Sequence, residues 1–446
     1  MTAPAHDKPI FSFYGDDFTG STDALDVLAG SGLKTVLFLQ PPSADHLAAF
    51  PDCRAVGIAG DSRSQPPDWM RLRLPAIFES LRSVGAPIVQ YKICSTFDSS
   101  PETGSIGCAL EIGQDVFDVD YVPIVAAAPL LRRYVLFGNL FAAEGEEVYR
   151  IDRHPAMRQH PITPMGESDL RLHLALQTSR KLAHVDMLTL SARDAHARFA
   201  NLLRQQPDGV LFDGMDRASL IRAAGLIWRD RNQPQTFVVG SSGFTTAMVE
   251  YWRGHGWVPD SAMPARAKAA DRVLVLAGSC SPATHRQVCH ALRNGFSGVP
   301  IDPAQMCDAS ANGSYRSSLS ADAVQHLAAG RSVVMYSALG PSSIREIGDR
   351  QMLAGEMGKL LHQAMLASGV RRVVVAGGDT ASFAVGELGI DALTFLAPLV
   401  PGAPLCKAHS AVPEWRRLEL VLKGGQVGPE TFFDDVLRPE RRIQQS

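Results

Sequence analysis

Short runs of apolar residues recur along the chain, and each is followed by a polar loop rich in Gly, Ser, Thr and Asp. A helical pattern of apolar positions follows several of these loops. Continuous apolar strands that alternate with helices are typical of parallel sheets covered on both faces. The sequence therefore predicts an α/β protein with two doubly wound, mainly parallel-sheet domains. The predicted strands are residues 10–14, 55–59, 88–93, 237–239, 272–277, 333–336 and 373–376.

Residues 254–271 are rich in Gly, Pro and Ala and lack a strong apolar period, which is typical of a linker. They predict an N-terminal domain over residues 1–253 and a C-terminal domain over residues 272–446. Parallel sheets bind ligands outside the carboxyl ends of their strands, where the polar loops lie. We expect the substrates to meet in a cleft between the two domains.

Two adjacent carboxylates, Asp16 and Asp17, follow the first predicted strand on a turn bounded by glycines. Like charges repel each other at this spacing, so a fold needs a reason to hold them there. They could accept hydrogen bonds from sugar hydroxyls, or one of them could act as a general base. The alternative, which the spacing leaves open, is that Asp17 or Thr19 only caps the next helix.

Two cations, Arg63 and Lys92, lie at the ends of two other predicted strands. Arg binds a carboxylate through two parallel hydrogen bonds and Lys acts as a point charge, so both suit an acidic substrate. Surface salt bridges are the alternative for each. The loop of residues 94–100 adds hydroxyls and Asp98, which could bind several hydroxyls of a polyol. No His in that loop could activate Cys94, so we interpret this cysteine as a small packed residue.

The C-terminal half holds three glycine-rich loops, at residues 278–281, 377–381 and 422–428. Glycines let phosphate oxygens approach the backbone, and the N–H groups at a helix start favour the anion. One such contact contributes about 0.3–1 kcal/mol when exposed, so several must converge to hold a triphosphate. A single loop of this kind is usually only a turn, but three in one domain indicate a nucleotide site.

Composition and charge argue against several other classes of protein. The formal net charge is -3 at pH 7, so no global field would attract DNA, RNA or an anionic membrane. The seven cysteines form no CxxC pair, which argues against a zinc site or a disulfide framework, and no metal-ligating residues are predicted. No apolar run reaches the ~18–20 residues that span a bilayer, and the first residues lack the pattern of a signal peptide. We therefore expect a cytoplasmic protein with no nucleic-acid or membrane partner.

Three common catalytic signatures are absent from the sequence. Without GxxxxGK[ST] the chain is not a P-loop enzyme by its signature, and without GxGxxG after a strand a nicotinamide dehydrogenase of the usual kind is disfavoured. The absence of GxSxG argues against an α/β-hydrolase.

Five segments together form a specific pattern: YGDDFTG at residues 14–20, YKICSTFDS at 91–99, LAGSCS at 276–281, GGDT at 377–380 and LKGG at 422–425. In order and over nearly the whole chain they resemble the four-carbon acid sugar kinases. Members of that family join a sugar-acid-binding N-terminal domain to a nucleotide-binding C-terminal domain. They phosphorylate threonate, erythronate or 3-oxo-tetronate with ATP.

One stretch departs from this family. Its members usually carry a Pro-Ala-Phe-Pro-like segment with Gly-Arg after the fourth strand, where this chain has VAAAPLLRRY at residues 125–134. The resemblance places this stretch along the substrate cleft, so its altered sequence argues against the linear four-carbon acids as substrates. A branched relative, 3-oxo-isoapionate, which is the substrate of one subgroup, joins the expected acids.

The resemblance implies a mechanism as well as a fold. The expected reaction is direct transfer of the γ-phosphoryl group of ATP to a hydroxyl, with Mg²⁺ bridging the phosphates. Arg63 and Lys92 would hold the substrate carboxylate, and Asp17, or in second place Asp16, would accept the hydroxyl proton. Asp379 is a rival base or a metal-organising group. The expected ATP contacts are Ser279, Ser281, Gly377, Gly378, Asp379, Thr380, Gly424 and Gly425.

Two readings from other classes stay open at this point. One is a non-catalytic sensor of a sugar acid or nucleotide, which would bind ATP without turnover. The other is a sugar-acid dehydratase or aldolase, which would act with a metal and without ATP, and against which the three glycine loops argue. The sequence also leaves open which acid and hydroxyl are used and whether the chain forms a homo-oligomer.

Overall fold

The computed structural model describes residues 8–160, 162–231, 233–259, 266–338 and 350–439, apart from the side chains of Arg350 and Asp379. The chain folds into two compact units. Unit 1 comprises residues 1–35 and 41–262, and unit 2 comprises residues 36–40 and 263–446. Both units are α/β with mainly parallel strands, which confirms the predicted fold class. The predicted domain limits and the cleft stay predictions.

Unit 1 is built on a sheet with strand order β3–β1–β4–β11–β5–β10–β9, in which the neighbouring strands run parallel. In the register of its central strands, Gly15 lies opposite both Ala59 and Lys92. The loops that follow β1, β3 and β4 therefore start side by side. The strands are β1 (Phe11–Gly15), β3 (Ala55–Ala59), β4 (Ile88–Lys92), β5 (Val122–Val125), β9 (Leu182–Val185), β10 (Gly209–Phe212) and β11 (Thr236–Gly240).

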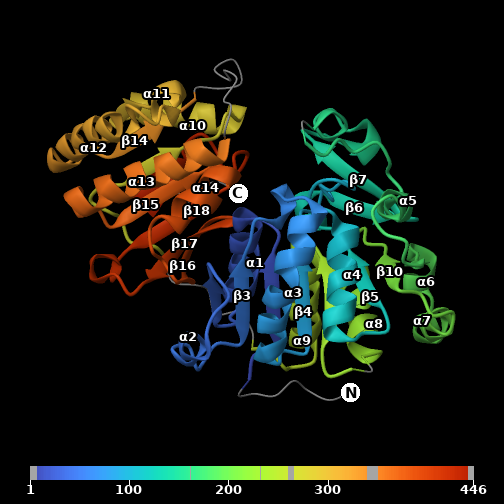
Figure 1. The fold of residues 1–446 in the computed structure, drawn as a ribbon. Coiled ribbons are helices and arrows are strands. Elements are labelled where there is room, and N and C mark those ends of the chain that lie inside the picture. Colours follow the sequence, from blue (N-terminus) through green and yellow to red (C-terminus); the bar gives the residue numbers. More distant parts are fainter. Residues whose placement is uncertain (1–7, 161, 232, 260–265, 339–349, 440–446) are drawn as a thin grey trace. The chain divides into compact units, whose positions relative to one another are not determined.

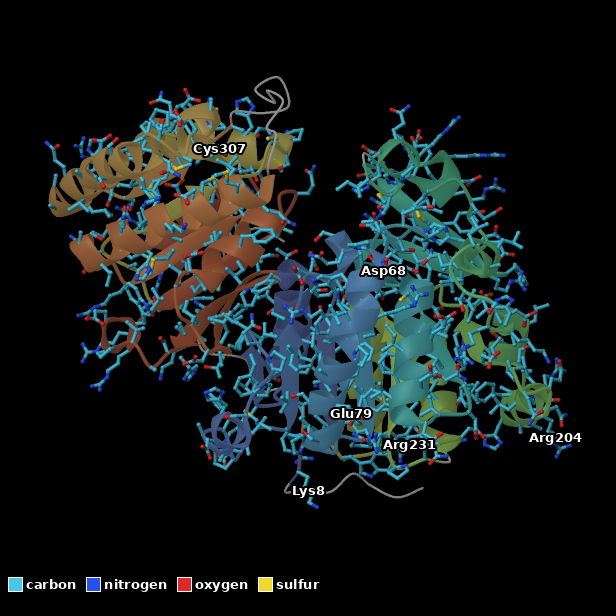
Figure 2. The ribbon with its side chains drawn as sticks, viewed as in Figure 1. Lys8, Asp68, Glu79, Arg204, Arg231 and Cys307 are labelled. Atoms are coloured by element: carbon cyan, nitrogen blue, oxygen red, sulfur yellow. The ribbon has the colours of Figure 1, made fainter. Side chains whose placement is uncertain are left out.

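Two groups of helices pack around this sheet, which explains why its central strands are buried along their whole length. Figure 1 shows α3 and α4 side by side, and in the second group α9 packs against both α1 and α8. The side chains of Glu79 on α3 and Arg204 after α7 point away from the ribbon and are exposed (Figure 2). The helices are α1 (Phe18–Gly30), α2 (Ala44–Ala48), α3 (Pro67–Val84), α4 (Ile106–Phe117), α5 (Leu170–Ala175), α6 (Met187–Ser191), α7 (Ala195–Leu203), α8 (Arg217–Arg229) and α9 (Ser242–Gly254).

A small antiparallel sheet follows β5 and belongs to unit 1. It consists of β6 (Arg133–Leu136), β7 (Asn139–Glu144) and β8 (Glu147–Arg150). The turn between β6 and β7 has positive φ at Phe137 and Gly138, as a two-residue hairpin loop requires. The buried carboxylate of Asp213 accepts hydrogen bonds from both of their backbone N–H groups, at 2.7 and 3.0 Å. The hairpin is therefore fixed to the main body of unit 1.

Unit 2 holds a mixed sheet with strand order β13–β14–β12–β15–β18–β17–β16–β2. The first five strands run parallel, and the rest pair antiparallel. Residues of β2 come from the N-terminal part of the chain and pair with β16 in the register Val36↔Thr394. The strands are β2 (Thr35–Phe38), β12 (Leu274–Ala277), β13 (Ser297–Pro300), β14 (Val333–Tyr336), β15 (Arg372–Ala376), β16 (Ala392–Val400), β17 (Ala403–His409) and β18 (Glu419–Lys423).

The helices of unit 2 also pack in two groups, α12 with α13 and α14, and α10 with α15. The core between strands and helices includes Val275, Val374, Val421 and Phe432, none of which is exposed. In the described part of the chain, no helix is long and apolar enough to cross a membrane. The helices are α10 (Pro282–Arg293), α11 (Pro303–Cys307), α12 (Asn312–Ala328), α13 (Arg350–Ser368), α14 (Gly378–Gly386) and α15 (Phe432–Leu437).

Candidate active site

Arg63 binds Asp16 and Asp17 at the carboxyl end of the unit 1 sheet. Its Nη2 donates to Asp16 Oδ1 at 2.6 Å and its Nε to Asp16 Oδ2 at 3.1 Å, which is the two-bond geometry of an arginine–carboxylate pair. The same Nη2 lies 2.9 Å from Asp17 Oδ1. Because the preceding strands β1 and β3 pair side by side, the sheet itself brings these residues together.

Asp17 also caps helix α1. Its Oδ1 accepts a hydrogen bond from the Gly20 backbone N–H at 2.7 Å, and its Oδ2 accepts one from the Thr19 hydroxyl at 2.6 Å. The capping alternative from the sequence therefore describes this side chain correctly. Capping does not remove Asp17 from the site, because the same carboxylate contacts Arg63.

The two carboxyl groups differ in their electrostatics. Burial raises the pKa of Asp16, although Arg63 opposes this effect. Burial acts on Asp17 in the same direction, but Arg63, the Thr19 hydroxyl and Lys92 outweigh it and lower the pKa of Asp17. Asp17 is therefore ionised at neutral pH and can accept a proton or a hydrogen bond, as a weak base.

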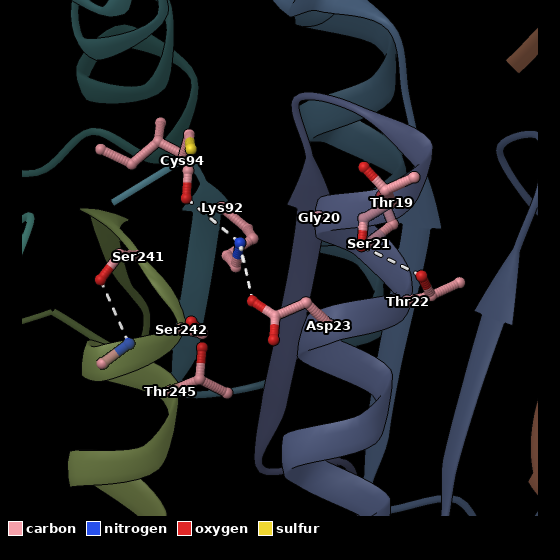
Figure 3. A network of polar contacts seen from close by, with 12 residues as sticks. Thr19, Gly20, Ser21, Thr22, Asp23, Lys92, Cys94, Ser241, Ser242 and Thr245 are labelled. Atoms are coloured by element: carbon pink, nitrogen blue, oxygen red, sulfur yellow. Dashed lines mark hydrogen bonds and ion pairs between the residues drawn. The ribbon is translucent and has the colours of Figure 1, made fainter. Parts of the chain in front are cut away.

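Lys92 is the second predicted cation, and it is 3% exposed at the end of β4. Its Nζ lies 3.3 Å from Asp23 Oδ2 on α1 and donates to the Ile93 carbonyl at 3.2 Å (Figure 3). Sequence analysis missed Asp23. Its signal is an acidic residue one helical turn after Thr19, on the face of α1 that points to Lys92.

Gly20 lies where these charged groups converge. A Cβ at this position would lie 2.4 Å from Asp17 Oδ1, 3.4 Å from Lys92 Nζ and 3.5 Å from Arg63 Nη2. The charged groups therefore form one cluster, which we call the Gly20 cluster. Its members are Asp16, Asp17, Asp23, Arg63 and Lys92.

The loop of residues 94–100 is strained at Phe97, a large buried residue with φ +62°. Ser99 Oγ donates to the Phe97 carbonyl at 3.0 Å and lies 2.9 Å from His173 Nε2. The ring of His173 also packs against the Phe97 ring, with centroids 5.9 Å apart. Such strain persists only where the surroundings over-determine the conformation, and it is common at functional sites.

From the sequence, Cys94 of this loop is expected to be a packed residue and Asp98 a substrate ligand. Burial raises the pKa of Cys94, and its Sγ lies 2.9 Å from Thr96 Oγ1. A neutral, partly buried thiol agrees with a packed residue rather than a nucleophile. Asp98, predicted to bind substrate, has a buried Oδ1 with no hydrogen-bond partner among the described residues.

The three glycine loops of unit 2 begin at the same edge of its sheet. Ala376 pairs with Ala277 on one side and with Lys423 on the other, so β12, β15 and β18 end level. Gly377 then adopts φ +126° as the residue before α14, which favours glycine at this position. Its N–H donates to the Lys423 carbonyl at 2.9 Å.

The predicted nucleotide residues of these loops contact one another. A Cβ at Gly278 would lie 2.1 Å from Thr380 Oγ1, and one at Gly425 would lie 2.4 Å from Ser279 Oγ. Ser281 caps α10, and its hydroxyl donates to the Gly425 carbonyl. Segments far apart in the chain therefore form one backbone-lined cradle of the kind that phosphates occupy.

Lys423, which the sequence analysis did not assign a role, lies fully buried beneath this cradle. Its Nζ donates to Thr284 Oγ1 at 3.1 Å and to the Gly424 and Gly425 carbonyls at 2.9 and 3.4 Å. Burial lowers the pKa of Lys423 to about 7. Its hydrogen-bond partners in the described part of the chain include no carboxylate, so a bound anion would stabilise its charge. The signal was a lysine inside an otherwise apolar strand end.

Asp379 belongs to α14, but its side chain lies outside the described residues, so its predicted role stays a prediction. Within the described ranges, no group of three or more His, Cys, Asp or Glu side chains could hold a metal ion. A Mg²⁺ ion that accompanies a nucleotide takes many of its ligands from phosphates and water.

Comparison with known proteins matches both units to described domain families. Residues 11–248 match the family described as a sugar-binding N-terminal domain. Residues 274–433 match the family described as a nucleotide-binding C-terminal domain. These ranges contain the Gly20 cluster and the glycine-loop cradle, respectively.

Two curated relatives align with nearly the whole of this chain and of their own length. A 3-oxo-isoapionate kinase from Paraburkholderia graminis is 43% identical and covers 95% of this chain and 93% of its own length. A 3-oxo-tetronate kinase from Cupriavidus necator is 31% identical over 97% of each chain. A solved structure from Salmonella typhimurium has the same fold, with a TM-score of 0.78 at 24% identity over 97% of this chain and 99% of that one. The chain therefore belongs to the four-carbon acid sugar kinase family, whose members are ATP-dependent sugar-acid kinases built from these two domains.

Proposed function

We propose that this kinase phosphorylates a primary hydroxyl of 3-oxo-isoapionate, a branched sugar acid, in carbohydrate catabolism. The observation that carries the proposal is 43% identity to the 3-oxo-isoapionate kinase of P. graminis, against 31% to a 3-oxo-tetronate kinase. The unusual segment 125–134 supports a substrate other than the linear acids. 3-Oxo-tetronate, threonate and erythronate are the alternatives.

On the acid side, the Gly20 cluster and Asp98 would form the substrate site. Asp17 would accept the proton of the reacting hydroxyl, and Asp16, Lys92 and Asp98 would contact the acid. Arg63 keeps Asp17 ionised and fixed through the 2.9 Å contact. The low basicity of Asp17 is compatible with phosphoryl transfer, because positioning and charge stabilisation carry most of that catalysis.

On the nucleotide side, the cradle would hold the phosphates through backbone N–H groups and hydroxyls. The residues are Ser279, Ser281, Gly377, Gly378, Thr380, Gly424 and Gly425, with Asp379 proposed beside them. Lys423 would place its charge beneath the phosphates. The fit is supported by the close approach at Gly278 and Gly425, where no side chain intervenes. Mg²⁺ would supply neutralisation of the phosphate charge when bound with ATP.

Each of the two substrates would be bound by its own domain. Residues 1–253 would form the acid-binding domain and residues 272–446 the nucleotide-binding domain, joined by residues 254–271. We infer a cytoplasmic enzyme, since its substrate ATP is abundant there.

The test is ADP release with Mg²⁺-ATP across 3-oxo-isoapionate, 3-oxo-tetronate, threonate and erythronate. We expect the highest kcat/KM with 3-oxo-isoapionate. A higher kcat/KM with a linear acid would overturn the proposed substrate but leave the kinase activity established. ATP binding without turnover on any of the four acids would favour the sensor alternative instead.

A further inference from the structure

The cations of the Gly20 cluster are already paired with acids. Arg63 binds Asp16 and Asp17, and Lys92 lies 3.3 Å from Asp23. Three carboxylates therefore face two cations, and with all five groups ionised the cluster is negative by one charge. An acidic substrate needs a cation that no protein carboxylate neutralises.

Arg133 is such a cation in unit 1. It is the first residue of β6, and its Nη1 donates to backbone carbonyls, those of Leu131 at 2.8 Å and Ala143 at 3.3 Å among them. Its Nε is buried and has no hydrogen-bond partner within the described ranges. In the same ranges Arg133 forms no ion pair, so backbone carbonyls hold its guanidinium in place and no carboxylate neutralises its charge.

Asp98 supplies an unpaired hydrogen-bond acceptor, because its Oδ1 is buried and has no hydrogen-bond partner in the described part of the chain. Asp98 directly follows Phe97, whose backbone is strained. The hydrogen bonds of Ser99 to the Phe97 carbonyl and to His173 hold that backbone conformation. The loop of Asp98 follows β4 and the segment of Arg133 follows β5, and both strands pair with β11, where Gly240 lies opposite Lys92 on one side and Val125 on the other. The two segments therefore leave the same carboxyl edge of the unit 1 sheet as the Gly20 cluster.

A donor and an acceptor at the same edge of one sheet, both buried and both unpaired, are costly unless a ligand satisfies them. One molecule that carries an anionic acceptor and a hydroxyl donor satisfies both, and that molecule is a hydroxy acid.

We propose that Arg133 binds the carboxylate of the acid substrate while Asp98 accepts a hydrogen bond from one of its hydroxyl groups, so that this pair sets specificity for the acid. The inference rests on the proposed function for the identity of the ligand. Arg63 and Lys92 then organise the reacting end of the substrate instead of holding its carboxylate.

Calorimetric titration without ATP tests the pair directly, with 3-oxo-isoapionate and its C1 carboxamide as probes. In Arg133→Met we expect binding of the acid to weaken by about 10²-fold, the effect of losing charge-assisted hydrogen bonds. Binding of the uncharged amide should change by less than about threefold. Arg133→Lys keeps the positive charge but lacks the planar guanidinium, and it should weaken binding of the acid by about tenfold.

Arg132→Met is the matched control. Arg132 is adjacent, and its side chain donates to the Gly145 and Glu146 carbonyls on the hairpin. Both the native residue and Met carry a side chain at its φ of +56°, so the substitution adds no new backbone strain. It should leave acid binding within about twofold and ADP release unchanged.

The outcomes separate this inference from the proposed function. The carboxylate role of Arg133 is overturned if Arg133→Met binds the acid as tightly as the wild type, or if its affinities for acid and amide fall by the same factor. This holds even when the wild type releases ADP. If the wild type binds the acid through Arg133 but transfers no phosphoryl group, the subsite stands and the kinase proposal fails.

Discussion

The guanidinium of Arg63 binds both carboxylate oxygens of Asp16 and one oxygen of Asp17, across 47 and 46 residues of chain. This single side chain explains how the fold holds two adjacent carboxylates at a strand end. It neutralises part of their repulsion and fixes the orientation of each. Five charged side chains at the carboxyl end of one sheet thereby become an ordered cluster around Gly20.

Replacing Arg63 by Met should destabilise unit 1 by about 3 kcal/mol or more, because it leaves two largely buried carboxylates without their partner. The side chain of Asp16 is only 3% exposed. Urea unfolding measures the loss. Arg82→Met removes a pair with Glu79 in which both side chains are about half exposed, and should cost less than about 1 kcal/mol. Equal losses in the two variants would contradict the buried role.

Replacing Asp17 by Asn should lower kcat by roughly 10²–10⁴-fold if Asp17 accepts the hydroxyl proton. Asn also caps helices well, so the stability of α1 should change little and the effect should appear in turnover. Steady-state ADP release with saturating substrates measures it. A kcat near that of the wild type would exclude Asp17 as the base and leave Asp16 and Asp379 as candidates.

Replacing Gly425 by Ala should raise the KM for ATP by about tenfold or more, since the new methyl group would lie 2.4 Å from Ser279 Oγ and distort the cradle. The KM for the acid should stay close to that of the wild type. Gly386→Ala, where a Cβ would meet nothing within 4 Å, is the control and should keep both constants. An unchanged KM for ATP in Gly425→Ala would remove this loop from the nucleotide site.

Lys423 gives the free energy of unfolding a distinct pH dependence. The pKa of this lysine falls from its ordinary 10.5 to about 7 in the folded chain. Between these values the unfolded chain binds more protons, so stability rises with pH across that window and levels off below pH 7. The slope from one such group is at most about 1.4 kcal/mol per pH unit.

Urea unfolding of the wild type and Lys423→Met at pH 7, 8 and 9 tests this slope. The stability of the wild type relative to the variant should grow as the pH rises. Lys407→Met, an exposed substitution on β17, should show the same pH dependence of stability as the wild type. A stability difference between wild type and Lys423→Met that does not vary with pH would show that this lysine keeps its proton in the folded chain.

Local sequence was sufficient for the elements that carry the site. Apolar runs set the strands, and the polar residues that break them mark the strand ends. The placement of Asp16, Arg63 and Lys92 at the ends of three strands therefore followed from neighbours in the chain. The same logic located the turn at Gly377, because few residues other than glycine adopt its φ of +126° before a helix.

What only the tertiary structure decided is which of these groups meet. Strand order and register placed Asp23 against Lys92 and put Lys423 beneath the glycine loops. They also left Arg133 and Asp98 with unpaired buried atoms. These relationships join segments distant in the chain, and they depend on sheet pairing and burial, which no local pattern encodes. The sequence by itself therefore determined the elements and the chemistry at their ends, while the packing of those elements decided which charges are neutralised and which stay available to a substrate.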